Sequence, residues 1–261
     1  NFGRKHKKLD LMSDTVVAII QARVTSSRLP GKILLPLAGA PLLQRMLERV
    51  ARIKKLHAIC LAIPKGAAHD PILDVAVPGT LLFRGDETDV LGRTYNAAKQ
   101  AGADVIMRVT SDCPLIDPIV SNEILTTFQN SPVVYARTAF TSGFPHGFDT
   151  EVFTMDALSA AHAEATADDE REHVTPFIWR QPDRFPALEV DYHPDFRHWR
   201  LTVDTPEDYE LAKQIFDKLF PQNPNFGFKE LRSLFAAQPE LLDINADNEQ
   251  PQLAGIPGMN S

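Results

Sequence analysis

The chain has 261 residues, 44% of them hydrophobic and 23% charged, which is typical of a globular protein with one α/β domain and a small lobe. The formal net charge of −7 excludes a surface that binds nucleic acid throughout, and no apolar run reaches the roughly 18 residues of a membrane span. The two cysteines, Cys60 and Cys113, form neither a disulfide framework nor a metal-ligand spacing, and they indicate a cytoplasmic protein.

Both ends of the chain differ in character from the middle. Residues 1–14 contain a basic run, and we expect this leader to be disordered or foreign to the natural chain, with Met12 near the natural start. A phosphate-binding tail is the alternative interpretation of the basic run. At the other end, residues 238–261 are polar and contain proline, so we expect a weakly ordered tail.

Short apolar runs alternate with amphipathic segments between residues 15 and 130. Strands are predicted at 16–20, 58–63, 80–83 and 105–109, and helices at 41–53, 90–101 and 119–128. The first run, VVAII, is typical of a strand buried on both faces, and Gly102 is suited to a left-handed helix cap. This alternation predicts a parallel sheet covered by helices, with ligands bound beyond the carboxyl ends of the strands.

The pattern is less regular from 131 to 197, and we expect this segment to form a smaller lobe or an interface within a main domain of residues 15–237. A helix is predicted at 155–165. A short strand is predicted at 200–203. A further helix then begins with the capping box Thr205-Pro206-Glu207-Asp208.

The loop after the first predicted strand, QARVTSSRLPGK, concentrates groups that bind phosphate. Its candidate ligands are Arg23, Ser26, Ser27, Arg28 and Lys32. Gly31 after Pro30 allows a tight turn in which backbone N–H groups approach a ligand. Cations with hydroxyl and backbone donors match the requirements of a triphosphate, although the spacing is not that of a P-loop. A solvated basic loop is the alternative.

Two carboxylates that follow predicted strands are candidate ligands of magnesium, Asp112 in RVTSDCPLIDP and Asp204 in RLTVDTPED. Carboxylates from distant segments often converge on one Mg²⁺ together with phosphate oxygens. Asp117 competes with Asp112 for this role, but it precedes Pro118 and could instead cap the next helix. The local alternative for Asp204 is a role near the cap formed by Thr205.

Further polar candidates lie between residues 149 and 173. Asp149 and Glu151 alternate along a predicted strand and should point to one face, to bind sugar hydroxyls or a metal or to form a polar surface. On a helix, His173 would not share a face with Arg171, and a lone histidine is more often structural than catalytic. The chain shows no Ser/His/Asp or Cys/His constellation.

Five segments occur in the order found in one protein family. The segment AIIQARVTSSRLPGKILLPLAGAPLLQRMLERV is similar to the start of the F-type proteins of spore-coat polysaccharide synthesis, a branch of the acylneuraminate and deoxy-octulosonate cytidylyltransferases. The segment RGDETDVLGRTYNAAKQAGADVIMRVTSDCPLIDP resembles the family's second block, and FDTEVF, EREHVTPFI and LTVDTPEDYE resemble its later blocks. The resemblance covers residues 16–219.

The resemblance implies a Rossmann-like nucleotidyltransferase fold, with a mixed, mostly parallel sheet and residues 131–197 as a lobe for substrate binding and dimerisation. It implies an enzyme that joins CMP from CTP to an acidic sugar, with Mg²⁺ as the cofactor and pyrophosphate as the leaving group. The expected partners are CTP, an anionic acceptor and a second copy of the chain, with no nucleic acid and no membrane.

The resemblance also implies a role for each matching residue. Those expected to act on the phosphates or hold the metal are Arg23, Arg28, Lys32, Asp112 and Asp204. Those expected near the nucleotide are Ala22, Ser26, Ser27, Arg84, Asp86 and Asp89. Those expected to face the acceptor are Asp149, Glu151, Arg171 and His173. The two carboxylates suit an anionic acceptor only if Arg171 or a metal offsets their charge. A glycosyltransferase, cytidylyl transfer to a non-sugar acceptor and an inactive nucleotide-binding scaffold remain alternatives.

Overall fold

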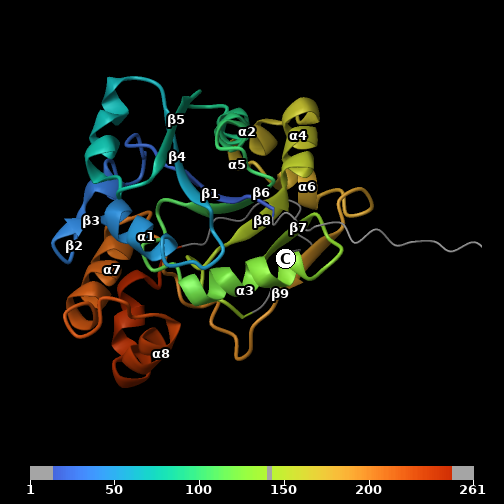
Figure 1. Ribbon diagram of the computed structural model, residues 1–261. Helices are drawn as coiled ribbons and strands as arrows, with labels where there is room; N and C mark the ends of the chain where they lie inside the picture. Colours follow the sequence, from blue (N-terminus) through green and yellow to red (C-terminus); the bar gives the residue numbers. More distant parts are fainter. Residues whose placement is uncertain (1–13, 140–142, 249–261) are drawn as a thin grey trace, which may run out of the picture.

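A seven-stranded mixed sheet forms the centre of the computed structural model, which describes residues 14–139 and 143–248 (Figure 1). In sheet order, the strands are β5 (Leu81–Gly85), β4 (Ala58–Pro64), β1 (Val16–Gln21), β6 (Val105–Thr110), β8 (Glu151–Thr154), β7 (Tyr135–Thr138) and β9 (Ala187–Val190). The first four are parallel, β8 is antiparallel to both of its neighbours, and β7 is parallel to β9. The predicted mixed, mostly parallel sheet is confirmed.

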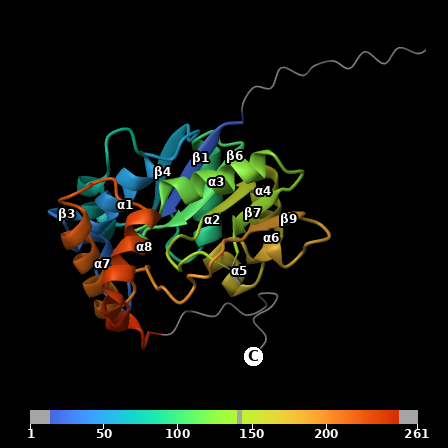
Figure 2. The same cartoon turned by 90° about the horizontal axis from the view of Figure 1, so that it is seen from below.

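Helices cover both faces of the sheet, as the two views show (Figures 1 and 2). One face carries α1 (Leu42–Val50) and α3 (Pro118–Gln129). The other carries α2 (Val90–Gln100), α4 (Met155–Glu164), α5 (Asp168–His173) and α6 (Pro176–Trp179). Successive residues of β1 alternate between the two core clusters, because side chains along a strand point to opposite faces. The strand is therefore buried on both faces, as its composition predicts.

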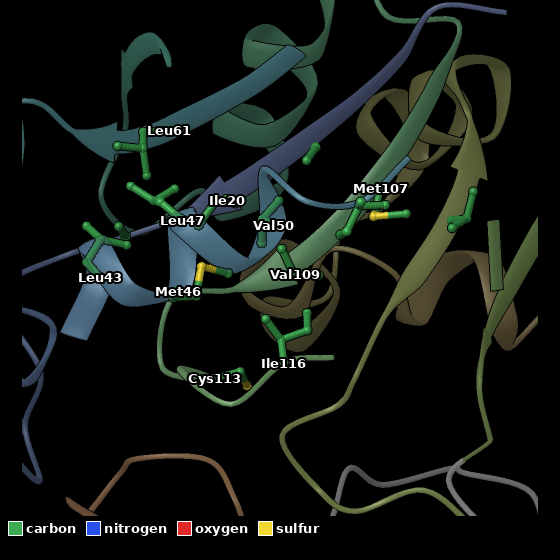
Figure 3. Packing of buried hydrophobic residues seen from close by; sticks show 14 of the residues in the cluster. Ile20, Leu43, Met46, Leu47, Val50, Leu61, Met107, Val109, Cys113 and Ile116 are labelled. Atoms are coloured by element: carbon green, nitrogen blue, oxygen red, sulfur yellow. The ribbon is translucent and has the colours of Figure 1, made fainter. Parts of the chain in front are cut away.

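Helix α1 turns an apolar side onto β1, β4 and β6 (Figure 3). The helix side chains in this contact are Leu43, Met46, Leu47 and Val50. Each is fully buried, and burial of such a side chain contributes about 1.5–3 kcal/mol. Cys113 and Ile116, from the loop after β6, belong to the same cluster. Asp112 therefore lies between two residues of the core cluster, Val109 in β6 and Cys113 in the loop.

Short elements connect this framework. A 3₁₀ helix, η1 (Lys32–Leu34), follows the loop after β1, and a small hairpin of β2 (Pro36–Leu37) and β3 (Ala40–Pro41) precedes α1. A second 3₁₀ helix, η2 (Ala67–Val75), joins β4 to β5. Within the described ranges, none of the helices combines the length and the apolar character needed to cross a bilayer.

The C-terminal part of the chain packs beside the loops at the carboxyl ends of the strands, where it shares a core cluster with Leu42 and Leu115. It consists of α7 (Pro206–Leu219), α8 (Phe228–Ala237) and the 3₁₀ helix η3 (Pro239–Asn245). The predicted capping box of α7 is confirmed, since the Thr205 hydroxyl accepts from the Asp208 N–H at 3.2 Å and the Asp208 carboxylate accepts from the Thr205 N–H at 3.1 Å. These helices share an aromatic core with Phe144, Phe148 and Trp199.

Two expectations about local structure differ from the observed fold. Residues 200–203 do not form a strand, because Arg200 makes only an isolated bridge to His146. Weak order after residue 237 is wrong for 239–245, because η3 packs on α7 through buried Leu241 and the Asn245 amide donates to the Asp208 carboxylate at 2.9 Å. The rest of the expected tail, 249–261, and residues 1–13 of the expected leader lie outside the described residues.

The segment 131–197 contributes β7, β8 and β9 to the main sheet, and α4, α5 and α6 cover one of its faces. This segment therefore continues the same layered structure. Its expected roles in acceptor binding and dimerisation stay predictions.

Candidate active site

The loop after β1 folds into a closed turn ahead of η1. The Gly31 N–H donates to the carbonyl oxygen of Val24 at 3.0 Å, and Gly31 has a φ of 69°. That left-handed backbone conformation favours glycine, as the sequence predicts for this turn. The turn places Lys32 at the start of η1, where its side chain enters the protein.

Lys32 connects the two predicted carboxylates. Its Nζ lies 2.8 Å from Asp112 Oδ2 and 2.8 Å from Asp204 Oδ1, and it also donates to the carbonyl oxygen of Val203 at 2.8 Å. Burial works to lower the pKa of Lys32, but the two carboxylates outweigh it and raise that pKa. Burial works to raise the pKa of Asp112, but the ammonium of Lys32 outweighs it and lowers that pKa. Three residues predicted from separate motifs thus meet in one charged cluster.

Asp112 and Asp204 differ in how many of their carboxylate oxygens already contact protein cations. Asp204 Oδ1 also lies 3.1 Å from the Arg28 guanidinium, and Asp204 Oδ2 lies 2.9 Å from Arg200. Asp112 Oδ1 meets the Cys113 thiol in a weak contact at 3.7 Å, and the Asp112 side chain is 25% exposed, against 9% for that of Asp204. Asp112 therefore presents the more available oxygen to a ligand.

A buried ion-pair network supports Asp204 from behind. Arg200 Nε and Nη2 reach the two oxygens of Asp208 at 2.9 and 3.1 Å, and all three side chains are nearly inaccessible to solvent. Sequence reasoning missed the role of Arg200. The only available signal was its i, i+4 spacing to Asp204, and the sequence alone does not show that this segment is buried.

The donor set fits a magnesium ion that binds together with phosphate. Among the described residues, no group of three or more His, Cys, Asp or Glu side chains is arranged to hold a metal by itself. Mg²⁺ in phosphate-transfer sites, however, is usually held by one or two carboxylates, with water and substrate oxygens completing the octahedron. Asp112 and Asp204 supply that minimal set. They lie close together, since both contact the Lys32 ammonium at 2.8 Å.

A cavity of about 350 Å³ opens beside this cluster. The predicted site residues that line it are Arg28, Asp112, Asp149, Glu151, His173 and Asp204. Four further basic residues of its wall were not identified from the sequence, namely Arg108, Arg137, His146 and Arg197. Arg108 and Arg137 lie within strands, and only the observed order of β6, β8 and β7 shows that their side chains share one cavity.

The two carboxylates of the cavity lining that lie outside the Lys32 cluster, Glu151 and Asp149, are both balanced by nearby groups. Glu151 accepts hydrogen bonds from Tyr135 at 2.5 Å and Thr175 at 2.6 Å, and it forms an ion pair with Arg108. Asp149 Oδ2 lies 3.2 Å from His146 Nδ1. Burial works to lower the pKa of His146, but Asp149 outweighs it and raises that pKa. Arg108 and His146 thus offset the carboxylates, a role that the sequence assigned to Arg171 or a metal.

Arg171 instead forms a bidentate pair with Asp89, at 2.9 and 2.6 Å, and does not line the cavity. His173 does line the cavity, so the two side chains take different directions, as helical spacing predicts. Asp117 caps α3 through the N–H groups of Ile119 at 2.7 Å and Val120 at 3.2 Å, which confirms its local alternative.

The residues expected near base and ribose form a separate group at the same edge of the sheet. Asp89 caps α2 through the Gly92 N–H at 2.9 Å, Asp86 accepts from the N–H groups of its own turn, and Arg84 pairs with Asp70. A hydrogen bond of 2.5 Å from Thr25 to Glu87 joins this turn to the loop after β1. The loops therefore meet as predicted, while the nucleotide roles of these residues stay predictions.

Comparison with known proteins gives a consistent result. A cytidylyltransferase family model matches residues 17–244. The spore coat polysaccharide biosynthesis protein SpsF of Bacillus subtilis is 32% identical over 235 residues, which cover 86% of this chain and 95% of SpsF. The 3-deoxy-manno-octulosonate cytidylyltransferase of Geobacter sulfurreducens is 31% identical over 123 residues, 47% of this chain and 49% of that enzyme.

Among solved structures, a cytidylyltransferase from Leptospira borgpetersenii superposes with a TM-score of 0.84 at 30% sequence identity, over 92% of this chain and 100% of that chain. The family resemblance seen in the sequence motifs is therefore confirmed along nearly the whole length. With Lys32, Asp112 and Asp204 gathered at the carboxyl edge of its sheet, the chain belongs to the cytidylyltransferase family and is a nucleotidyltransferase.

Proposed function

We propose that the enzyme joins CMP from CTP to an acidic sugar, with release of pyrophosphate, in the synthesis of a surface polysaccharide or glycan. The observation that carries this proposal is the position of the Lys32–Asp112–Asp204 cluster, which borders a cavity whose lining includes Arg28, Arg108, Arg137 and Arg197. The names of two relatives agree with it, one a 3-deoxy-manno-octulosonate cytidylyltransferase and the other a spore coat polysaccharide protein.

The proposed reaction is an in-line displacement at the α-phosphorus of CTP. The oxygen of a sugar hydroxyl forms the new P–O bond and its proton passes to the solvent, while the bond to the β-phosphate oxygen breaks as pyrophosphate leaves. Lys32 and Arg28 would bind phosphate oxygens and neutralise the charge that grows on them. Asp112 and Asp204 would hold Mg²⁺, which when bound withdraws charge from the same oxygens. The protein supplies no nucleophile in this scheme.

The basic residues of the cavity favour an anionic acceptor. Arg108 Nε is buried and has no hydrogen-bond partner among the described residues, although the same guanidinium pairs with Glu151. Arg197 adds a half-exposed guanidinium to the cavity wall. Arginine is well suited to bind a carboxylate through two parallel hydrogen bonds, so a sugar acid fits this wall better than a neutral sugar does.

An acceptor screen tests the proposal. The purified enzyme, CTP and Mg²⁺ would be incubated with 2-keto sugar acids, their neutral reduced counterparts, sugar phosphates and non-sugar alcohols, and pyrophosphate release would be measured. Turnover only with sugar acids is the expected result. Turnover only with a neutral sugar or a non-sugar alcohol would overturn the acidic-sugar assignment. Calorimetric titration with CTP, UTP, ATP and GTP would test the nucleotide separately from the acceptor.

Replacing Asp112 by asparagine tests the metal assignment. Asp112→Asn keeps the shape of the side chain but removes the charge that would attract Mg²⁺, so we expect turnover to fall by about 100-fold or more. Binding of Mn²⁺ in the presence of CTP, followed by electron paramagnetic resonance, should weaken in parallel. Asp183→Asn, a change at an exposed site, is the matched control. Normal Mn²⁺ binding and normal turnover in Asp112→Asn would show that this carboxylate is not a ligand.

A further inference from the structure

A second cavity, of about 290 Å³, lies between α1 and the turn that follows α7. The two helices are neighbours in both views of the fold (Figures 1 and 2). The side chains that matter for its chemistry are Arg45, Glu48, Arg49 and Arg52 on the α1 side and Phe216 and Phe220 on the α7 side. None of its lining residues belongs to the 350 Å³ cavity beside Lys32, so the two sites are separate.

Positive charge in this second cavity exceeds negative charge. Three arginines line it, and Glu48 is the one acidic residue of its wall. Glu48 is already paired with Arg45 at 2.8 Å. Arg49 is 3% exposed and forms no ion pair within the described part of the chain, since its Nε and Nη2 donate to the carbonyl oxygens of Ile116 at 2.8 Å and Leu115 at 3.4 Å.

Arg52 carries an unused donor at the same place. Its Nη1 donates to Asn225 Oδ1 at 2.7 Å, whereas its Nη2 is buried and lacks a hydrogen-bond partner among the described residues. Buried donors are normally satisfied, so an unsatisfied one calls for a ligand or an ion. Burial, reinforced by the neighbouring charge of Arg52, lowers the pKa of Arg49 to about 10. The charge of Asp117 acts on both guanidinium groups and offsets part of this repulsion, but with Glu48 paired to Arg45 positive charge stays in excess along the cavity wall.

The aromatic residues hold the guanidinium groups in place. Arg45 lies over the ring of Phe220, 4.2 Å from its centroid, and Arg49 lies 4.7 Å from the centroid of Phe226. Such stacking fixes the planes of the two groups before any ligand arrives. An anion in the cavity would accept a hydrogen bond from Arg52 Nη2, the donor that has no partner among the described residues, and would lie close to the buried charge of Arg49.

We propose that this cavity is a binding site for a small, multiply charged oxyanion of the phosphate class, held chiefly by Arg49 and Arg52. Its volume falls just below the range of about 300–1,000 Å³ that is usual for drug-sized ligands, which favours inorganic phosphate or pyrophosphate over a whole nucleotide. The site is independent of the reaction proposed above, because it shares no residue with the cavity beside Lys32.

Calorimetric titration of the full chain with inorganic phosphate and with pyrophosphate tests this site. The active site would also attract these anions, so each titration is run with and without saturating CTP and Mg²⁺. We expect binding that persists with CTP present and that weakens at least tenfold in Arg52→Gln. Arg184→Gln, which removes an exposed arginine elsewhere, is the control and should bind as the wild type does.

A second variant keeps the test decisive if Arg52→Gln folds poorly. Asn225→Asp places a carboxylate beside Arg52 Nη1, so it should compete with the anion and weaken binding without removing any arginine. Absence of phosphate and pyrophosphate binding would overturn the proposal. So would binding that CTP displaces completely, or binding that neither Arg52→Gln nor Asn225→Asp changes.

Discussion

Lys32→Ala is expected to lower kcat for CMP transfer by about 100- to 1,000-fold, the usual effect of losing a donor that stabilises charge in the transition state. The reason is position: the Lys32 ammonium lies between the two carboxylates at the edge of the cavity where the phosphates are proposed to bind. Pyrophosphate release with the acceptor found in the screen is the measurement. Calorimetry should show weaker CTP binding by the same variant.

Lys99→Ala is the matched control, since it removes an exposed lysine at the end of α2, remote from the cluster. Circular dichroism of both variants must show the wild-type fold before their rates are compared. Near-normal turnover by a correctly folded Lys32→Ala would show that the ammonium has only a structural role between Asp112 and Asp204.

Arg200→Met should produce the largest loss of stability. The Arg200 side chain is 4% exposed and forms two hydrogen bonds to Asp208, which is 0% exposed, and one to Asp204. Removing one partner of a buried ion pair leaves the other charge uncompensated, which costs about 3–5 kcal/mol of the free energy of unfolding. Urea denaturation followed by the fluorescence of adjacent Trp199, which is buried, measures this change.

A surface ion pair serves as the comparison for this loss. Lys213 and Asp217 lie one turn apart on α7 and are both about half exposed. Lys213→Met also replaces a cation by methionine, as Arg200→Met does. Water screens the exposed Lys213–Asp217 pair, so the urea midpoint of unfolding should stay close to that of the wild type. Equal midpoints for the two methionine variants would contradict the view that the Arg200 network is an important part of the structure.

The sequence predicted those features that depend on local pattern. The burial of β1 on both faces, with side chains that alternate between two core clusters, follows from its continuous apolar run. The capping box at Thr205 follows from the residue types at four consecutive positions. Asp112 was predicted because a carboxylate just after a buried strand in a parallel sheet lies where ligands bind, and it does follow β6. Asp204 was predicted on the same ground, but the strand expected before it does not form, so the rule does not explain its place beside Lys32. Each of these features requires information from only one segment.

What the sequence could not predict depends on how distant segments pair. The predicted strand at 200–203 failed because strand formation needs a partner along its length, and only Arg200 meets His146. Arg108 was missed because the antiparallel placement of β8 beside β6 is what brings it to Glu151 and the cavity. Weak order was wrong for residues 239–245, because polar composition does not reveal the contact of Asn245 with Asp208.

The bridge formed by Lys32 has a thermodynamic consequence for substrate binding. The Lys32 ammonium is paired with both Asp112 and Asp204, so a metal ion at the carboxylates would compete with the ammonium, and a phosphate at the ammonium would compete with the carboxylates. A metal ion bound to the carboxylates would free the ammonium for a phosphate, and a phosphate bound to the ammonium would free the carboxylates for a metal ion. Linkage then requires that the metal strengthen nucleotide binding by the same factor as the nucleotide strengthens metal binding. If the proposed metal and phosphate sites are correct, an internal ion pair of this kind would make the enzyme select the metal–nucleotide complex over either component alone.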